Sequence, residues 1–296
     1  MSHKLLKTGQ PTRQLTMFDT ACIIVGIIIG AGIFRAPPLV AASLPSASLI
    51  LTAWFAGGLL ALLGALCYAE LTTTYPEPGG DYVYLTRAYG SRAGFLFVWA
   101  EFWIIRPGST GPMAFVFGEY FKQLLPLGTG YDTLVYAVLA IVGITGLNML
   151  GVRAGKWTQN LLTVVKVLAL VGVFLAAFAV STPLPSSPAA TLTMPPLAAI
   201  SFAMLMVMFC FGGWNDVAFV AGEVRQPEKN LLRSLLLGVG VVTAVYLLVN
   251  IAYLQVLGVE GLANTKTPAT DMMSLSVGSG GKRLASAMIC VAALGA

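Results

Sequence analysis

The stretch GIIIGAGIF at residues 26–34 places three glycines inside an otherwise apolar segment. Glycine lacks a Cβ atom and readily leaves the helical conformation. Two prolines follow at residues 37 and 38, and proline is not tolerated in the interior of a helix because it has no N–H. We therefore expect a helix that is broken near its middle and that does not continue far beyond residue 37.

A second stretch, FCFGGWND at residues 209–216, has a glycine pair in the middle of another apolar run. Broken helices at membrane depth are tolerated only where the freed backbone faces protein or a cavity. The two breaks lie in the first and sixth apolar runs, which are corresponding positions of two five-helix repeats. This pattern is typical of secondary transporters built from inverted repeats. The alternative is that the glycines only allow close packing of neighbouring helices.

The composition places the whole chain in a membrane. Of 296 residues, 57% are hydrophobic and 10% are charged, and the mean hydropathy is +0.83. A soluble domain carries about 25% charged residues. The composition excludes a disordered tail, a coiled coil and a nucleic-acid binder, although Lys and Arg (17) outnumber Asp and Glu (12).

The apolar runs predict one all-α domain, a polytopic transmembrane helix bundle, because a bilayer crossing needs about 20 apolar residues. The last run, after Arg283, is too short to cross, so we expect a C-terminally incomplete chain or a stump that pairs with something absent. The expected spans are residues 15–37, 47–69, 93–121, 133–152, 157–180, 197–222 and 234–258, with a partial span at 284–296.

The basic residues predict the orientation of these spans. Lys and Arg are twice as frequent in the connecting segments on the side of the amino terminus as in those on the other side. Cytoplasmic loops retain Lys and Arg. We therefore expect a multi-pass protein of the cell membrane with a cytoplasmic amino terminus.

The breaks also predict a ligand class. A half-helix that starts near Gly32 presents free N–H groups and the positive end of its dipole, which suit a carboxylate. The half-helices that end near Ile28 and at residues 209–212 present free carbonyl groups, which suit an ammonium. The two together match a zwitterion, that is, an α-amino acid held by its backbone.

Several motifs in the same order resemble the amino acid-polyamine-organocation superfamily, and within it the L-type amino acid transporters and their bacterial exchangers. They are GAGIF (30–34), YAEL (68–71), PGGDY (78–82), IIRP (104–107), FGGWN (211–215), Glu223 and PEKNL (227–231). Members of that family have twelve spans and a 5+5 inverted-repeat core of the leucine-transporter type. The resemblance implies that this chain covers spans 1 to 7 and the start of span 8.

The resemblance also implies the site. The N–H groups of Ala31, Gly32 and Ile33 would hold the substrate carboxylate, carbonyls of both breaks would receive the ammonium, and Phe209 would be an aromatic gate. Asn215 is explained equally well by helix capping. The full expected substrate-binding set is Ile28, Gly30, Ala31, Gly32, Ile33, Phe209, Cys210, Gly212 and Asn215, and the carbonyls concerned are those of Ile28, Phe209, Cys210 and Gly212.

Lys166 is the expected coupling residue. A lysine in the middle of a bilayer helix costs about 2.5–3.5 kcal/mol on insertion scales, so it normally faces the protein interior. By resemblance it occupies the place of sodium in sodium-coupled relatives, where it would tie span 1 to span 5 or respond to protons. The alternative is a purely structural contact between helices.

Two further polar residues share span 3. Glu101 and Arg106 are five residues apart, which places them about 140° apart on an ideal helix. We therefore do not expect them to pair, and we interpret Arg106 as structural. No nucleophile with a base and no metal-ligand cluster is recognisable, so neither an enzyme, a metal site nor a cofactor is expected.

The predicted function is transport of neutral L-amino acids by sodium-independent exchange and alternating access, because the residues around the breaks are uncharged. A proton-coupled amino acid permease or an amine or polyamine permease is the alternative, and a non-transporting membrane fragment is a further one. The expected partners are the amino acid and the lipid bilayer. Animal L-type transporters carry a Cys after span 3 for a disulfide-linked subunit, and residues 126–132 contain none, so we expect no such subunit.

Overall fold

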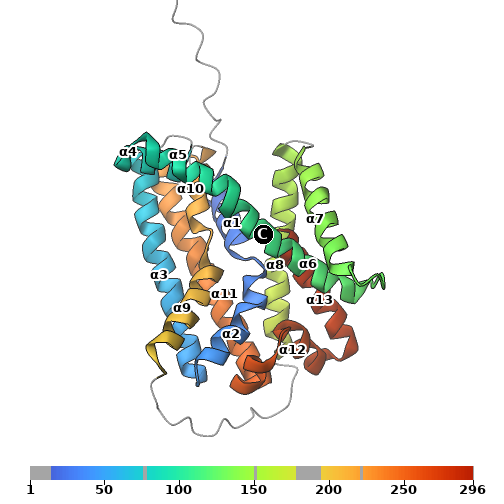
Figure 1. The fold of residues 1–296 in the computed structure, drawn as a ribbon. Helices are drawn as coiled ribbons and strands as arrows, with labels where there is room; N and C mark the ends of the chain where they lie inside the picture. The colour runs from blue at the N-terminus through green and yellow to red at the C-terminus, as the bar shows by residue number, and fades with distance from the viewer. Residues whose placement is uncertain (1–14, 76–78, 150–151, 178–194, 221–222, 296) are drawn as a thin grey trace, which may run out of the picture.

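The computed structural model describes residues 15–75, 79–149, 152–177, 195–220 and 223–295, and within them it is a bundle of helices (Figure 1). In chain order the elements are α1 (Met17–Ile28), η1 (Ala31–Phe34), α2 (Ala36–Ser43), α3 (Ala47–Thr74), α4 (Asp81–Tyr89), α5 (Ser91–Ala100), η2 (Glu101–Ile105), α6 (Arg106–Leu124), α7 (Asp132–Met149), α8 (Val152–Ala177), α9 (Leu197–Phe211), η3 (Trp214–Asp216), α10 (Val217–Val220), α11 (Pro227–Asn264), α12 (Pro268–Val277) and α13 (Ser279–Leu294). This confirms the predicted all-α class.

Four helical segments in the described part of the chain are long and apolar enough to cross a membrane. They are Ala47–Thr74, Asp132–Met149, Leu197–Phe219 and Pro227–Asn264. The other expected crossings coincide with helices that are interrupted or that carry a charge. The first follows α1, η1 and α2, and the third follows α5, η2 and α6. The fifth follows α8, which contains Lys166. The result is consistent with a polytopic membrane bundle.

The first helical path extends beyond the expected end at residue 37. Pro37 and Pro38 lie in the first turn of α2, which continues to Ser43. Proline is favourable there because the first turn of a helix has no acceptor for its N–H groups. The expectation that these prolines stop the span is therefore wrong, since they lie in the first turn of α2, which continues the second half that η1 begins. The short helices α4 and α12 lie outside the expected spans.

The two broken helices run antiparallel through the middle of the bundle. Figure 1 shows α1 leading down into α2, while α9 leads up into α10. In addition, α1 contacts η3 and α9 contacts η1, so each break lies against the other helix. At the upper end, the Leu15 N–H donates to the Glu223 carbonyl and the Arg225 N–H donates to the Leu15 carbonyl, both at 2.9 Å. This antiparallel pairing is compatible with the predicted inverted repeat.

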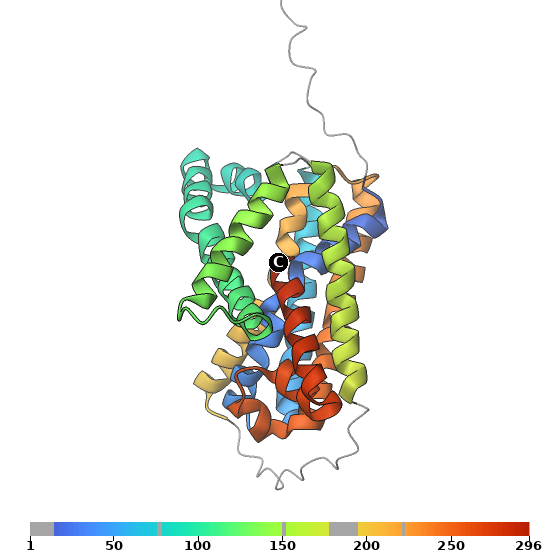
Figure 2. The same cartoon turned by 90° about the vertical axis from the view of Figure 1, so that its right-hand side faces the viewer.

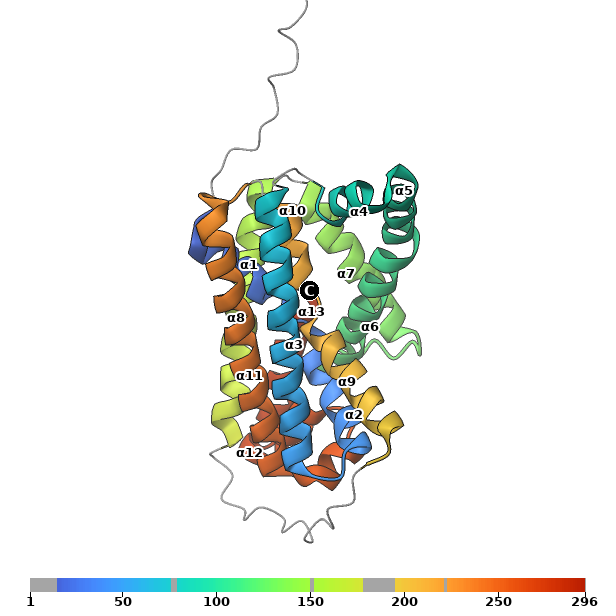
Figure 3. The ribbon, with the colours of Figure 1, turned by 90° about the vertical axis from the view of Figure 1, so that its left-hand side faces the viewer.

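The remaining helices support this pair from both sides. Figure 3 shows α3 and α11 side by side along one face, and they are in contact. Figure 2 shows α13 between α8 and the green helices α6 and α7, and α13 contacts both α8 and α6. Three buried aromatic rings, from Trp54, Phe211 and Tyr246, pack behind the second break with centroids 5.1 to 6.2 Å apart. The breaks are thus held in a packed core.

Candidate functional site

The first break lies where the glycines predict it. Helix α1 ends at Ile28, Gly30 is extended (φ −108°, ψ −164°), and η1 starts at Ala31. The first N–H groups of a helix have no acceptor within that helix. The break therefore presents carbonyl groups at the end of α1 and N–H groups at the start of η1.

The second break has a sharper turn. Helix α9 ends at Phe211, and Gly213 adopts a left-handed conformation (φ +104°) before η3 begins. A Cβ atom on Gly213 would lie 2.7 Å from Cγ2 of Ile27, so a side chain at this position would collide with α1. Glycine is required here for both the backbone conformation and the close approach of the two broken helices.

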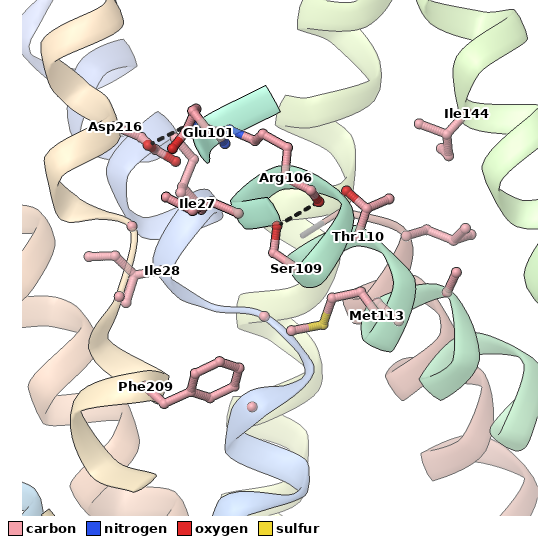
Figure 4. A pocket seen from close by; sticks show the side chains of 18 of the residues that line it. Ile27, Ile28, Glu101, Arg106, Ser109, Thr110, Met113, Ile144, Phe209 and Asp216 are labelled. Carbon is pink, nitrogen blue, oxygen red and sulfur yellow. Dashed lines mark hydrogen bonds and ion pairs between the residues drawn. The ribbon is translucent and has the colours of Figure 1, made fainter. Parts of the chain in front are cut away.

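A cavity of about 660 Å³ opens between the two breaks and span 3. Ala31 and Ile33 are not among its lining residues, and both are buried. Phe209 lines it and is 63% exposed, and Figure 4 shows its ring on the lower side of the cavity. The expected site residues that line the cavity are Ile28, Gly30, Gly32, Phe209, Cys210, Gly212 and Asn215.

The Tyr246 hydroxyl joins the two breaks. It lies 3.0 Å from the Ile28 carbonyl oxygen and 3.1 Å from the Cys210 carbonyl oxygen, and it has one proton to donate. The Ile28 carbonyl also accepts the Gly30 N–H at 2.9 Å. Two of the carbonyls expected to receive an ammonium, those of Ile28 and Cys210, therefore already accept hydrogen bonds from groups of the protein. The sequence reasoning missed Tyr246, although a tyrosine inside an apolar helix generally indicates a buried hydroxyl with a partner.

Lys166 lies behind α1 and does not line the cavity. Its side chain is 1% exposed, and its Nζ donates to the Gly26 carbonyl at 2.9 Å. A Cβ atom on Gly26 would overlap the Thr163 hydroxyl, so α1 and α8 pack closely at this point. The contact links spans 1 and 5, and for Gly26 the close-packing interpretation of the glycines is the correct one.

Arg106 joins span 3 to span 6, contrary to the expectation that it does not pair with Glu101. Its Nε lies 2.6 Å from Glu101 Oε1, and its Nη2 lies 3.2 Å from Asp216 Oδ1 (Figure 4). The expectation assumed an ideal α-helix, whereas residues 101–105 form a π-helix in which the Arg106 N–H bonds to the Glu101 carbonyl. The π-helical i→i+5 bond places the two residues one above the other.

The cavity is therefore more polar than the sequence indicates. Asp81, Glu101, Arg106 and Asp216 all line it, so the uncharged character predicted from the breaks does not extend to the whole cavity. Span 3 also contributes Ser109, Thr110 and Met113. Sequence reasoning missed these residues because nothing in the spacing shows which face of span 3 turns toward the breaks.

We predict that Tyr246→Phe destabilises the protein. The change removes a buried donor and leaves the Ile28 and Cys210 carbonyls with one partner fewer, which costs about 1–3 kcal/mol. Tyr253→Phe is the matched control, since Tyr253 is on the same helix and is equally buried, while its hydroxyl has no partner in the described part of the chain. Thermal unfolding in detergent measures both. Equal losses for the two variants would contradict the role assigned to the Tyr246 hydroxyl.

Comparisons with known proteins identify the family of this chain. A family model described as "Amino acid permease" matches residues 15–296. The b(0,+)-type amino acid transporter 1 of Mus musculus is 36% identical over 85% of this chain and 53% of its own length. The Asc-type amino acid transporter 1 of Mus musculus is 32% identical over 87% of this chain and 50% of its own length. The serine/threonine exchanger SteT of Bacillus subtilis is 29% identical over 96% of this chain and 64% of its own length.

This chain spans about half the length of the mammalian relatives and about two thirds of the bacterial one. The matches run through both broken helices and the helices that support them. They confirm the resemblance stated from the motifs. The chain belongs to the amino acid permease family.

Proposed function

We propose that the protein is a secondary transporter of neutral L-amino acids that works by sodium-independent exchange through alternating access. The observation that carries this proposal is the pair of antiparallel broken helices facing one cavity. The relatives are named as amino acid transporters, and one is named as a serine/threonine exchanger. Transport by discontinuous helices at the middle of the membrane is the general use of this arrangement.

The proposed binding mode follows from the backbone at the breaks. The N–H groups at the start of η1 would hold the substrate carboxylate, and carbonyls at the ends of α1 and α9 would hold the ammonium. A Cβ atom on Gly32 would lie 3.1 Å from Cys210 Sγ, so the two breaks already approach closely without a side chain. The substrate side chain would point toward Ser109, Thr110 and Met113 of span 3.

The Lys166 ammonium group would take the place that a sodium ion occupies in sodium-coupled transporters of this architecture. Its bond to the Gly26 carbonyl connects α8 to α1 just before the break. A change in the position of α1 would therefore strain or break this bond. We assign Lys166 to coupling and not to substrate contact, because it lies outside the cavity.

The proposed setting is the cell membrane with the amino terminus in the cytoplasm. The expected partners remain the amino acid and the bilayer. The connection between α6 and α7, residues 125–131, contains no cysteine, so we propose that no accessory subunit is disulfide-linked there.

An amine or polyamine permease is the second candidate. It is favoured by the three carboxylates that line the cavity, from Asp81, Glu101 and Asp216, against the single guanidinium of Arg106. A polyamine would use such an acidic excess directly. Two of these carboxylates, from Glu101 and Asp216, are however paired with Arg106.

An exchange assay tests the proposed function. Proteoliposomes that contain the purified protein are loaded with unlabelled L-serine, and the uptake of labelled L-serine is followed. We expect uptake only when the lumen contains a neutral amino acid, and competition by alanine or leucine. Faster exchange of putrescine than of any neutral amino acid would favour the second candidate instead.

We predict that Gly32→Val abolishes substrate binding. A β-branched side chain would crowd Cys210 at the point where the backbone must approach the ligand. The control is Gly240→Val, because a Cβ atom on Gly240, in the middle of α11, meets no atom within 4 Å. Binding of labelled L-serine to the two purified variants measures the effect. Unchanged affinity in a folded Gly32→Val protein would contradict the site.

We predict that exchange needs no sodium gradient and that Lys166→Ala lowers the turnover rate more than the apparent affinity. The reason is that the Lys166 charge acts on the position of α1 and not on the ligand. Lys229→Ala, which removes an exposed cation, is the control. Initial rates with and without sodium measure both effects. A steep sodium requirement of the unsubstituted protein would show that Lys166 does not replace the ion.

A further inference from the structure

Arg106 carries the only positive charge among the described residues that line the cavity. Its side chain is 51% exposed, so a ligand in the cavity could reach it. An unpaired guanidinium in such a place would be a ready site for the carboxylate of an acidic side chain, because arginine binds carboxylates through paired hydrogen bonds. The surroundings of Arg106 decide whether it is available.

Two carboxylates form ion pairs with the Arg106 guanidinium. Glu101 lies 2.6 Å from Nε, and Asp216 lies 3.2 Å from Nη2. They come from different elements, since Glu101 begins η2 on span 3 and Asp216 ends η3 on span 6. The aromatic ring of Phe219 covers part of the same group, with its centroid 5.8 Å from Cζ. The guanidinium is thus engaged on two edges, and Figure 4 shows the three charged groups gathered on the upper side of the cavity.

The charge balance of the cavity disfavours an acidic ligand. With Asp81, the described residues that line the cavity carry three carboxylates and one guanidinium. A glutamate side chain would meet like charges and a cation that is already paired, and placing like charges together is costly in a partly desolvated site. A neutral side chain would face the hydroxyls of Ser109 and Thr110 and the thioether of Met113, which also line the cavity, and it would displace no ion pair.

We propose that Glu101 and Asp216 determine specificity by masking Arg106, so that the cavity rejects acidic amino acids. This inference rests on the proposed function and adds the selection of side-chain charge at the same cavity. It assigns a role to the π-helix of span 3, because that turn brings Glu101 over Arg106. Masking also requires span 6, since Asp216 supplies the second carboxylate.

The test is the double substitution Glu101→Gln with Asp216→Asn, which keeps the shapes of both side chains and removes both charges. Binding of labelled L-serine to purified protein is competed with unlabelled L-glutamate and with unlabelled L-serine. The quantity measured is the ratio of the two half-inhibitory concentrations. We expect this ratio to fall about tenfold or more in the double variant, because glutamate gains a charge-assisted bond to Arg106.

The matched control adds Arg106→Gln to the double substitution. In this triple variant the ratio should return toward that of the unsubstituted protein, because the freed cation is gone. An unchanged ratio in the double variant, or a gain that persists in the triple variant, would overturn the inference. If the double variant does not bind serine, the single variants decide, and the inference fails if neither of them lowers the ratio. Absence of serine binding in the unsubstituted protein would instead refute the proposed function.

Discussion

The hydrogen bonds of the Tyr246 hydroxyl to the Ile28 and Cys210 carbonyls are the interaction on which the centre of this molecule depends. A helix broken in a membrane leaves backbone groups that have no water to bind, and each must find a partner in the protein or in a cavity. Tyr246 is fully buried and reaches both breaks from α11, packed against Trp54 and Phe211. One side chain thereby contacts the backbone of both broken helices at their breaks.

Ion pairs connect span 3, which lines the cavity, to the two broken helices. Arg106 pairs with Glu101 on its own span and with Asp216 on the broken span 6, while Arg35 just after the first break pairs with Glu119 further along span 3. Span 3 is thus bonded to both broken helices. The alternating-access movement proposed above would have to rearrange these ion pairs.

The sequence was sufficient for the class of fold and for the location of both breaks, because glycines interrupt the two apolar runs and are followed by prolines after the first break and by polar residues after the second. It was insufficient for the walls of the cavity. The pairing of Glu101 with Arg106 depends on a local π-helix, and helical spacing on an ideal helix excluded it. Tyr246 also escaped prediction, since its role depends on a contact between residues more than two hundred positions apart in the chain.

Competition with end-blocked ligands tests most directly whether the two breaks recognise the backbone of an α-amino acid. Binding of labelled L-serine is challenged with L-serine, with its carboxamide and with its N-acetyl derivative. If the N–H groups after Gly30 hold the carboxylate and carbonyls of the breaks hold the ammonium, L-serine competes and both blocked forms lose most of their affinity. Competition by either blocked form at the same concentration as L-serine would contradict the claim.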